Sequence, residues 1–210
     1  MRVHARTESI INTSISASSL APAIRVAAVM LAVAVTGAAA QVSVRLPFTP
    51  VPFVLTPLAV LLCGAALGSR AGAAAQILYL AAGAAGLPVF APSAELPPGV
   101  LRLLGPTGGY LMAYPVAAFV AGYFAESGWD RRYWSSVAAM LLGLAVIFMG
   151  GLSWLTLTVT HSLGGAITLG LSWFIALDVV KVLVAAAILP SSWKLIGRRT
   201  TDYRSKTSKY

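Results

Sequence analysis

The sequence predicts an all-α polytopic membrane protein, a compact bundle of six transmembrane helices with both termini in the cytoplasm. Of its 210 residues, 58% are hydrophobic and 10% are charged, whereas a soluble domain carries roughly 25% charged residues. Apolar runs that approach the roughly 20 residues needed to cross a bilayer recur along the chain. Because so few polar side chains cannot cover a soluble surface, the outer surface of the bundle is expected to face lipid.

The chain divides into a helical domain, residues 23–190, between two cytoplasmic tails. Residues 1–22 are rich in Ser, Thr and Ala and are expected to form a flexible tail, and residues 191–210 form a basic one. A signal peptide is the competing interpretation of the N-terminus, because Ala38-Ala39-Ala40-Gln41 resembles a cleavage site. The apolar run continues past that point, which favours a first spanning helix.

Prolines, glycines and charges set the expected helix boundaries, because proline lacks an N–H and clashes with the preceding helical turn. Three prolines in six residues make 45–53 a stiff extended loop, and five more make 87–106 the longest irregular stretch. Pro57 is tolerated in the first turn of its helix. The expected helices are 22–44, 54–67, 71–86, 105–125, 133–158 and 166–189.

The distribution of basic residues predicts the orientation. Twelve of the 15 Lys and Arg residues lie in the two tails, at the start of the first helix (Arg25) or in the loops after the second and fourth helices. Arg45 and Arg102 lie on the opposite side, and Lys181 lies inside a span. The positive-inside rule then places both termini in the cytoplasm, which requires an even number of helices. The net charge of +9 therefore indicates contact with the lipid bilayer and no nucleic-acid partner.

Asp178 and Lys181 are the two ionisable residues deep inside a predicted span. Inserting an ionised Asp or Lys at the centre of a spanning helix costs about 2.5–3.5 kcal/mol. The presence of both residues therefore indicates that they form a pair or serve a function. Their i,i+3 spacing places them on one face of the helix. They form either a structural ion pair or a polar anchor facing a cavity, where they suit a ligand with N–H and C=O groups, such as a urea or amide.

The start of the fourth helix, Gly105-Pro-Thr-Gly-Gly-Tyr110, is a second candidate site. Free backbone N–H groups and the helix dipole attract anions, so Gly108 and Gly109 are candidates for holding a carboxylate, with Tyr110 beside them. An ordinary, closely packed helix start is the alternative. The remaining candidate is Gln76, an amide within the third helix that is expected to line the site.

Two arginines on the outer side, Arg45 and Arg102, each lie beside a proline-bounded loop. Either one is placed to attract an anionic solute or to cover the site. Contact with lipid headgroups is the alternative for each.

Small residues crowd the first helix, and Ala28 and Ala32 are spaced four apart. Such spacing allows close helix approach in lipid. The two alanines are expected either to pack within the chain or to dock against another membrane protein.

The sequence offers no support for an enzyme. It contains no Gly-x-x-x-x-Gly-Lys-Ser/Thr phosphate loop, no His-Glu-x-x-His zinc motif and no Cys/His cluster. The single cysteine, Cys63, excludes a disulfide within the chain. No cofactor or metal is expected, and the chain cannot hydrolyse ATP through a phosphate loop of that kind.

Four motifs together resemble the BioY family, the biotin-binding S components of energy-coupling factor (ECF) transporters. They are Val44-Arg-Leu-Pro-Phe-Thr-Pro-Val-Pro-Phe53, Gly86-Leu-Pro-Val-Phe-Ala91, Gly105-Pro-Thr-Gly-Gly-Tyr-Leu111 and Asp178-x-x-Lys181. The resemblance covers about residues 23–190 in order and spacing. It implies a protein of the prokaryotic cytoplasmic membrane, with six helices around a biotin site near the outer face and no catalysis.

The resemblance also implies partners and a mode of delivery. S components work with a transmembrane coupling protein and two cytoplasmic ATPases, and they dock through an Ala-x-x-x-Ala-like face that Ala28 and Ala32 would supply. The S component topples within the membrane to release its ligand.

Biotin suits the candidate residues, because it combines a ureido ring with a carboxylate. Asp178 would accept from the ureido N–H groups and Lys181 would donate to the ureido carbonyl. The helix start at Gly108–Tyr110, with Arg45, would hold the carboxylate, although the reverse orientation stays open. The alternatives are an S component for another water-soluble vitamin and a membrane scaffold subunit without a ligand.

Overall fold

A computed structural model describes residues 21–93 and 96–191 of the chain. These residues contain eight α-helices and one short β-hairpin. The helices are α2 (Ala21–Gln41), α3 (Thr56–Leu67), α4 (Ser69–Ala84), α5 (Leu101–Leu104), α6 (Gly108–Glu126), α7 (Tyr133–Leu155), α8 (Leu163–Gly170) and α9 (Ile175–Ala185). A short 3-10 helix, Trp129–Arg131, precedes α7, and a π-helical turn, Thr156–Thr160, continues it. The predicted tails, 1–22 and 191–210, lie outside the described residues except for residues 21, 22 and 191.

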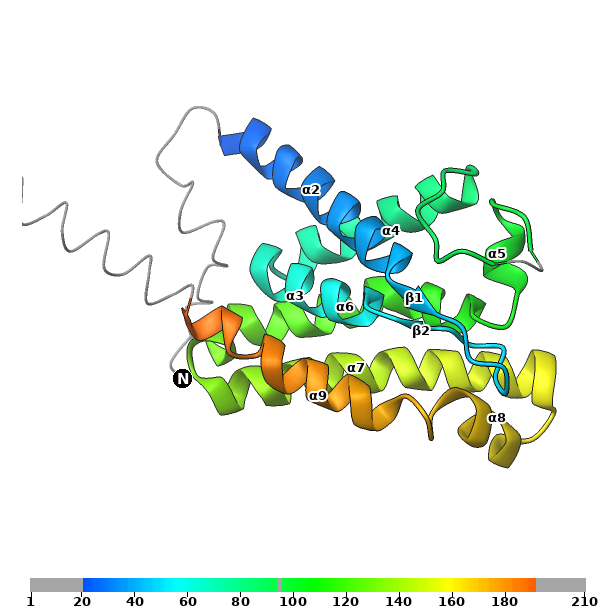
Figure 1. Cartoon of the computed structure of the whole chain (residues 1–210). Coiled ribbons are helices and arrows are strands. Elements are labelled where there is room, and N and C mark those ends of the chain that lie inside the picture. The colour runs from blue at the N-terminus through cyan, green and yellow to red at the C-terminus, as the bar shows by residue number, and fades with distance from the viewer. Residues whose placement is uncertain (1–20, 94–95, 192–210) are drawn as a thin grey trace, which may run out of the picture.

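Figure 1 shows the long helices side by side in one bundle, which confirms the predicted all-α fold class. Pro22–Gln41, Gly108–Glu126 and Tyr133–Thr160 are each long and apolar enough to cross a membrane, and a bent helix pair adds up to one more span. The shorter helices α3 and α4 have 12 and 16 residues. The count of six spanning helices and the cytoplasmic location of both termini stay predictions.

The proline-rich loop predicted at 45–53 is the turn of a hairpin. Strand β1 (Ser43–Val44) pairs antiparallel with β2 (Phe53–Val54), so that Ser43 lies opposite Val54. The prolines fall in the turn between the strands, where a missing N–H removes no ladder hydrogen bond. This pairing also explains why α2 ends at Gln41 and not at the predicted Val44.

The prediction of one continuous sixth helix over residues 166–189 is wrong. The structure has two helices there, α8 and α9, which bend by 52° at the break between them. At the break, the Gly170 carbonyl accepts a hydrogen bond from the Tyr110 hydroxyl at 2.9 Å. The Phe174 amide donates to Leu171 instead of continuing the helical ladder from Gly170. A long-range contact therefore interrupts an apolar run that contains no proline.

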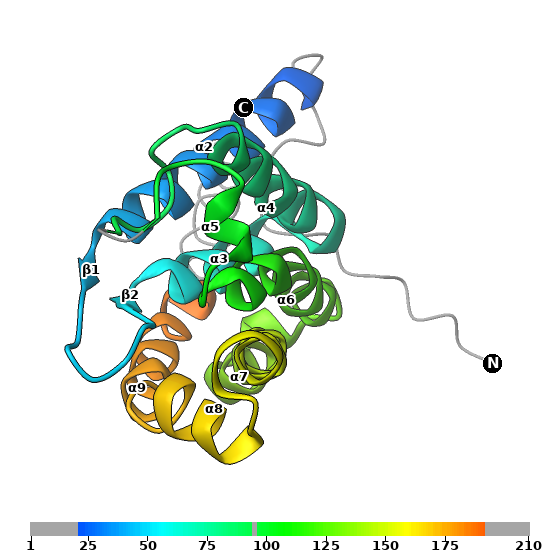
Figure 2. The same cartoon turned by 90° about the vertical axis from the view of Figure 1, so that its right-hand side faces the viewer.

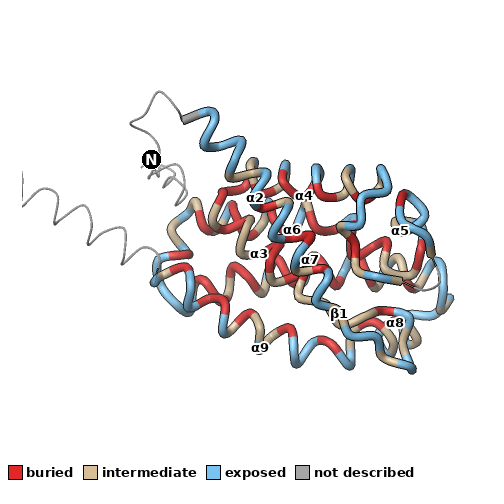
Figure 3. Tube along the Cα trace, turned by 45° about the horizontal axis from the view of Figure 1, so that its top comes forward, coloured by how far each residue is buried: buried red, intermediate tan, exposed pale blue. Residues whose placement is uncertain are grey.

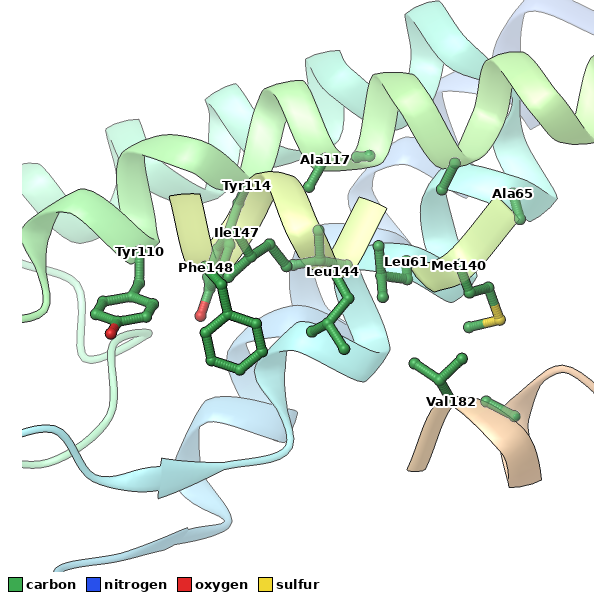
Figure 4. Close-up of a cluster of buried hydrophobic side chains, with 14 of the residues drawn as sticks. Leu61, Ala65, Tyr110, Tyr114, Ala117, Met140, Leu144, Ile147, Phe148 and Val182 are labelled. Atoms are coloured by element: carbon green, nitrogen blue, oxygen red, sulfur yellow. The ribbon is translucent and has the colours of Figure 1, made fainter. Parts of the chain in front are cut away.

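The core lies between α6 and α7, with α3, α4 and α9 packed around them. Leu61 from α3, Met140 from α7 and Val182 from α9 converge there and are almost completely buried (Figure 4). Small residues allow close helix crossings: a Cβ added to Gly64 of α3 would lie 2.5 Å from the Ala118 carbonyl oxygen of α6. These contacts provide a closely packed frame for the site at one end of the bundle.

Helix α2 lies on the outside of the frame, and most of its large apolar residues are exposed, as expected for lipid contact (Figure 3). Ala32 is only 4% exposed and packs with Leu67 of α3 and Ala75 of α4. Ala28 packs against the same cluster. The structure thus gives both alanines an intramolecular packing contact, and the predicted role in partner docking stays a prediction.

The described arginines separate along the bundle. Arg25, Arg70, Arg131 and Arg132 lie at or near the N-terminal ends of α2, α4 and α7, and all four are exposed. These helix ends lie together at the left of Figure 1, whereas Arg45 and Arg102 belong to the hairpin and α5 at the right. This separation agrees with the sorting of charge on which the predicted orientation is based.

Candidate ligand-binding site

A cavity of about 720 Å³ lies at the end of the bundle that carries the hairpin, α5 and α8. Figure 2 looks onto this end. The hairpin (residues 45–54) and the α8–α9 break form two of its walls. The others come from the start of α3, the first turns of α6, the middle of α7, Tyr79 of α4, and residues 90–93, 96, 102, 106 and 107. Segments far apart in the sequence therefore enclose one space, whose volume is typical of small-molecule sites.

Asp178 is the carboxylate among the described residues that line this cavity. It lies in the first turn of α9 and is 7% exposed. Its Oδ1 accepts a hydrogen bond from Lys181 Nζ at 2.7 Å, in the i,i+3 pair that the sequence predicts. The helix start after the break also places the positive end of the α9 dipole beside this carboxylate, which stabilises the charge.

Lys181 has no atom among the groups that line the cavity. Its ammonium donates to the Val54 carbonyl at 2.9 Å as well as to Asp178, and it lies 3.6 Å from the centre of the Phe53 ring. The ammonium thus joins α9 to the second strand of the hairpin, with a cation–π contact as its third neighbour.

Three tyrosines contribute hydroxyl-bearing rings to the lining: Tyr79, Tyr110 and Tyr114. Tyr110 donates to Gly170, and Tyr79 donates to the Val89 carbonyl at 3.2 Å. Figure 4 shows Tyr110, Tyr114 and Phe148 on the side of α6 and α7 that faces the hairpin. Only Tyr110 was predicted, although Tyr114 follows it at i+4, a spacing that places both on one helix face.

Two arginines lie at the rim of the cavity. Arg45 of the hairpin turn is exposed, and Arg102 of α5 is partly buried. Arg102 donates from Nη2 to the Ala91 carbonyl at 2.8 Å, and its buried Nε has no partner among the described residues. Burial and the nearby charge of Arg45 both lower the pKa of Arg102. Two like charges with an unused donor make this rim a favourable place for an anion.

Gln76 does not reach the cavity, contrary to the expectation that it lines the site. Its side chain is fully buried where α2, α3 and α4 meet. Its Nε2 donates to the Thr36 hydroxyl at 3.2 Å, and that hydroxyl donates to the Ala32 carbonyl at 2.8 Å. In this arrangement the amide links α4 to α2.

Gly108 and Gly109 also lie outside the lining. The Gly108 N–H donates to the Gly105 carbonyl at 2.9 Å, so it is not free for a carboxylate. A Cβ on Gly109 would meet the backbone carbonyl of Gly150 and the side chain of Trp154 on α7. The structure thus favours close helix packing at this helix start, while Pro106, Thr107 and Tyr110 face the cavity.

Comparisons with known proteins identify the family of this chain. A sequence model of the BioY family matches residues 11–198. A probable biotin transporter BioY of Pyrococcus horikoshii is 39% identical over 163 residues, which cover 78% of this chain and 92% of that protein. The biotin transporter BioY of Thermotoga maritima is 37% identical over 145 residues, which cover 69% of this chain and 82% of that protein.

A solved structure shares the fold. The crystal structure of an S component for biotin from an ECF-type ABC transporter superposes with a TM-score of 0.75. The superposition covers 84% of this chain and 94% of that one, at 22% sequence identity. The family match over the whole helical domain and the identity of the relatives lead to one conclusion: this chain belongs to the BioY family.

Proposed function

We propose that this chain captures biotin as the S component of an ECF-type transporter and takes part in its uptake across the cytoplasmic membrane of a prokaryote. The observation that carries the proposal is one cavity that has a buried carboxylate at Asp178 and two arginines at its rim. Biotin offers matching groups at its two ends, ureido N–H donors and a carboxylate. Relatives of this chain are named as biotin transporters.

The geometry favours one orientation of the ligand. The ureido N–H groups donate to Asp178, and the carboxylate lies at Arg45 and Arg102 near the mouth. The apolar parts of biotin then meet the aromatic lining of the cavity, which includes Phe148 and Tyr110. The reverse orientation would place a carboxylate against Asp178, and two like charges at a buried site repel strongly.

Calorimetry of the purified protein with biotin tests the proposal. Heat with a one-to-one stoichiometry at micromolar biotin is expected. No heat with biotin, combined with heat from another water-soluble vitamin, would reassign the ligand. A protein that shows no heat and no thermal shift with any vitamin of the panel would fit a scaffold subunit without a ligand.

Partners are part of the proposal. A transmembrane coupling protein and two cytoplasmic ATPases are proposed to drive uptake, with Ala28 and Ala32 near the docking face on α2. Because Ala32 is buried in the described conformation, docking through it would require α2 to shift. Biotin uptake by cells that express this chain with and without the coupling module tests the dependence on these partners.

The arginine rim predicts selectivity for a ligand with a free carboxylate. Arg45→Gln and Arg102→Gln are each expected to weaken biotin binding by about tenfold, the loss of one charge-assisted hydrogen bond at roughly 1.4 kcal/mol. Binding of biotinamide, whose tail is neutral, should change little. Calorimetry with both ligands measures the difference, and Arg70→Gln, at the other end of the bundle, is the matched control. Equal losses for both ligands would remove the arginines from carboxylate recognition.

A further inference from the structure

The hairpin Ser43–Val54, which forms one wall of the cavity, is fastened to the α8–α9 segment at three places. At its turn, the Thr49 hydroxyl donates to the Leu169 carbonyl at 2.6 Å. The Phe48 ring lies 4.8 Å from that of Trp173. At the base, Lys181 Nζ donates to the Val54 carbonyl at 2.9 Å. The three contacts reach α8, the break and α9 in turn, so the broken helix holds the hairpin both at its turn and at its base.

Lys181 has no donor left for a ligand in this arrangement. An ammonium group has three N–H donors, and here its neighbours are Asp178 Oδ1, the Val54 carbonyl and the face of the Phe53 ring. Its side chain lies behind Asp178 and outside the cavity lining. Because Oδ1 of Asp178 bonds to Lys181, Oδ2 is the oxygen available to a ligand N–H.

We propose that Lys181 is a positioning residue: its ammonium fastens the hairpin to α9 and orients the Asp178 carboxylate, and it does not contact the ligand. This inference rests on the proposed function for its ligand, and it departs from the direct contact that the sequence suggested. Its consequence is that the hairpin wall and the acceptor for the ureido group are held by one cation. Replacing Lys181 by an uncharged residue is therefore expected to release the base of the hairpin from α9.

The rate at which biotin dissociates distinguishes a positioning role of Lys181 from a direct contact between Lys181 and biotin. Lys181→Met keeps the length of the side chain and removes the ammonium. Thr49→Val removes the hydroxyl that donates to the Leu169 carbonyl and accepts from the Val51 amide. Each is expected to speed the release of labelled biotin, by about tenfold for Lys181→Met and severalfold for Thr49→Val. Since both act on one hairpin, the double variant should release biotin little faster than Lys181→Met alone, because contacts in one network are not additive. If Lys181 contacts biotin directly, the two factors multiply, which would overturn the proposal.

A measurement without ligand tests the fastening itself. Spin labels at Pro50→Cys in the hairpin turn and Gly164→Cys on α8, in a Cys63→Ala background, report the distance between the two elements by electron paramagnetic resonance. Both sites are exposed, and a side chain at Gly164 meets open space. A narrow distance distribution is expected with Lys181 present and a broad one with Lys181→Met. An unchanged distribution would overturn the proposal, whether or not the protein binds biotin.

Two further variants distinguish the loss of the hairpin contacts from a general loss of folding. Thr49→Val lies at the partly buried hairpin turn, leaves the buried ion pair intact and is expected to broaden the same distribution. Thr168→Val removes a hydroxyl whose hydrogen bond stays within α8, so the distance and the release rate should not change. A narrow distribution in Thr49→Val would contradict the fastened hairpin even if Lys181→Met fails to fold.

Discussion

Replacing Asp178 by alanine is expected to weaken biotin binding by more than about 30-fold, a loss above about 2 kcal/mol. The variant removes the acceptor for the ureido N–H groups and leaves the Lys181 ammonium without its anionic partner at a poorly solvated position. Breaking one partner of a buried ion pair costs more than the pair contributes, because the remaining charge is uncompensated. Calorimetry of the purified variant with biotin measures the loss.

Two variants on the same helix sharpen this prediction. Asp178→Asn keeps the shape and one acceptor oxygen but loses the charge, so its affinity should fall between those of the wild type and the alanine variant. Val180→Ala is the matched control, because Val180 is 55% exposed and lies two residues away on α9. Unchanged biotin affinity in Asp178→Ala, in a protein that is still folded, would assign the ion pair to structure alone.

The ion pair shows what sequence reasoning can establish. The cost of charge in a spanning helix singles out Asp178 and Lys181, and the i,i+3 spacing predicts that they meet, as they do at 2.7 Å. The same reasoning treats the two residues as equivalent ligand contacts. Their difference depends on the hairpin, whose Val54 carbonyl is 127 positions away in the sequence from Lys181. No local pattern carries that information.

The break between α8 and α9 is hidden for a similar reason. Hydropathy and proline positions predict one helix, whereas the break depends on the hydrogen bond from Tyr110 of α6 to Gly170, 60 positions apart. Gln76 shows the same dependence on distant residues. The sequence identifies an unusual amide in a spanning helix, but the hydrogen bond to Thr36 makes the side chain face α2 and not the cavity. Residue type predicts that such groups need partners, and the packing of distant helices decides which partners they have.

The glycine at the start of α6 provides a prediction of large effect on stability. Gly109→Ala is expected to destabilise the protein by about 1–3 kcal/mol, the usual cost of overpacking. The added methyl group would meet the Gly150 backbone carbonyl on α7, which cannot rotate away as a flexible side chain can. At about 3 °C per kcal/mol for a chain of this size, the thermal midpoint should fall by several degrees. Thermal unfolding in detergent, followed with a fluorescent probe, measures the shift.

The same substitution at Gly164 is the control, because a Cβ there meets nothing within 4 Å. Gly164→Ala should leave the midpoint unchanged or raise it slightly, since alanine favours the helix. Binding distinguishes packing from the anion site that the sequence suggested for Gly109. If Gly109 only holds α6 against α7, any loss of affinity in Gly109→Ala is equal for biotin and biotinamide, because both lose the same preformed cavity. A loss confined to biotin, with an unchanged midpoint, would contradict the packing role and return the carboxylate to this helix start.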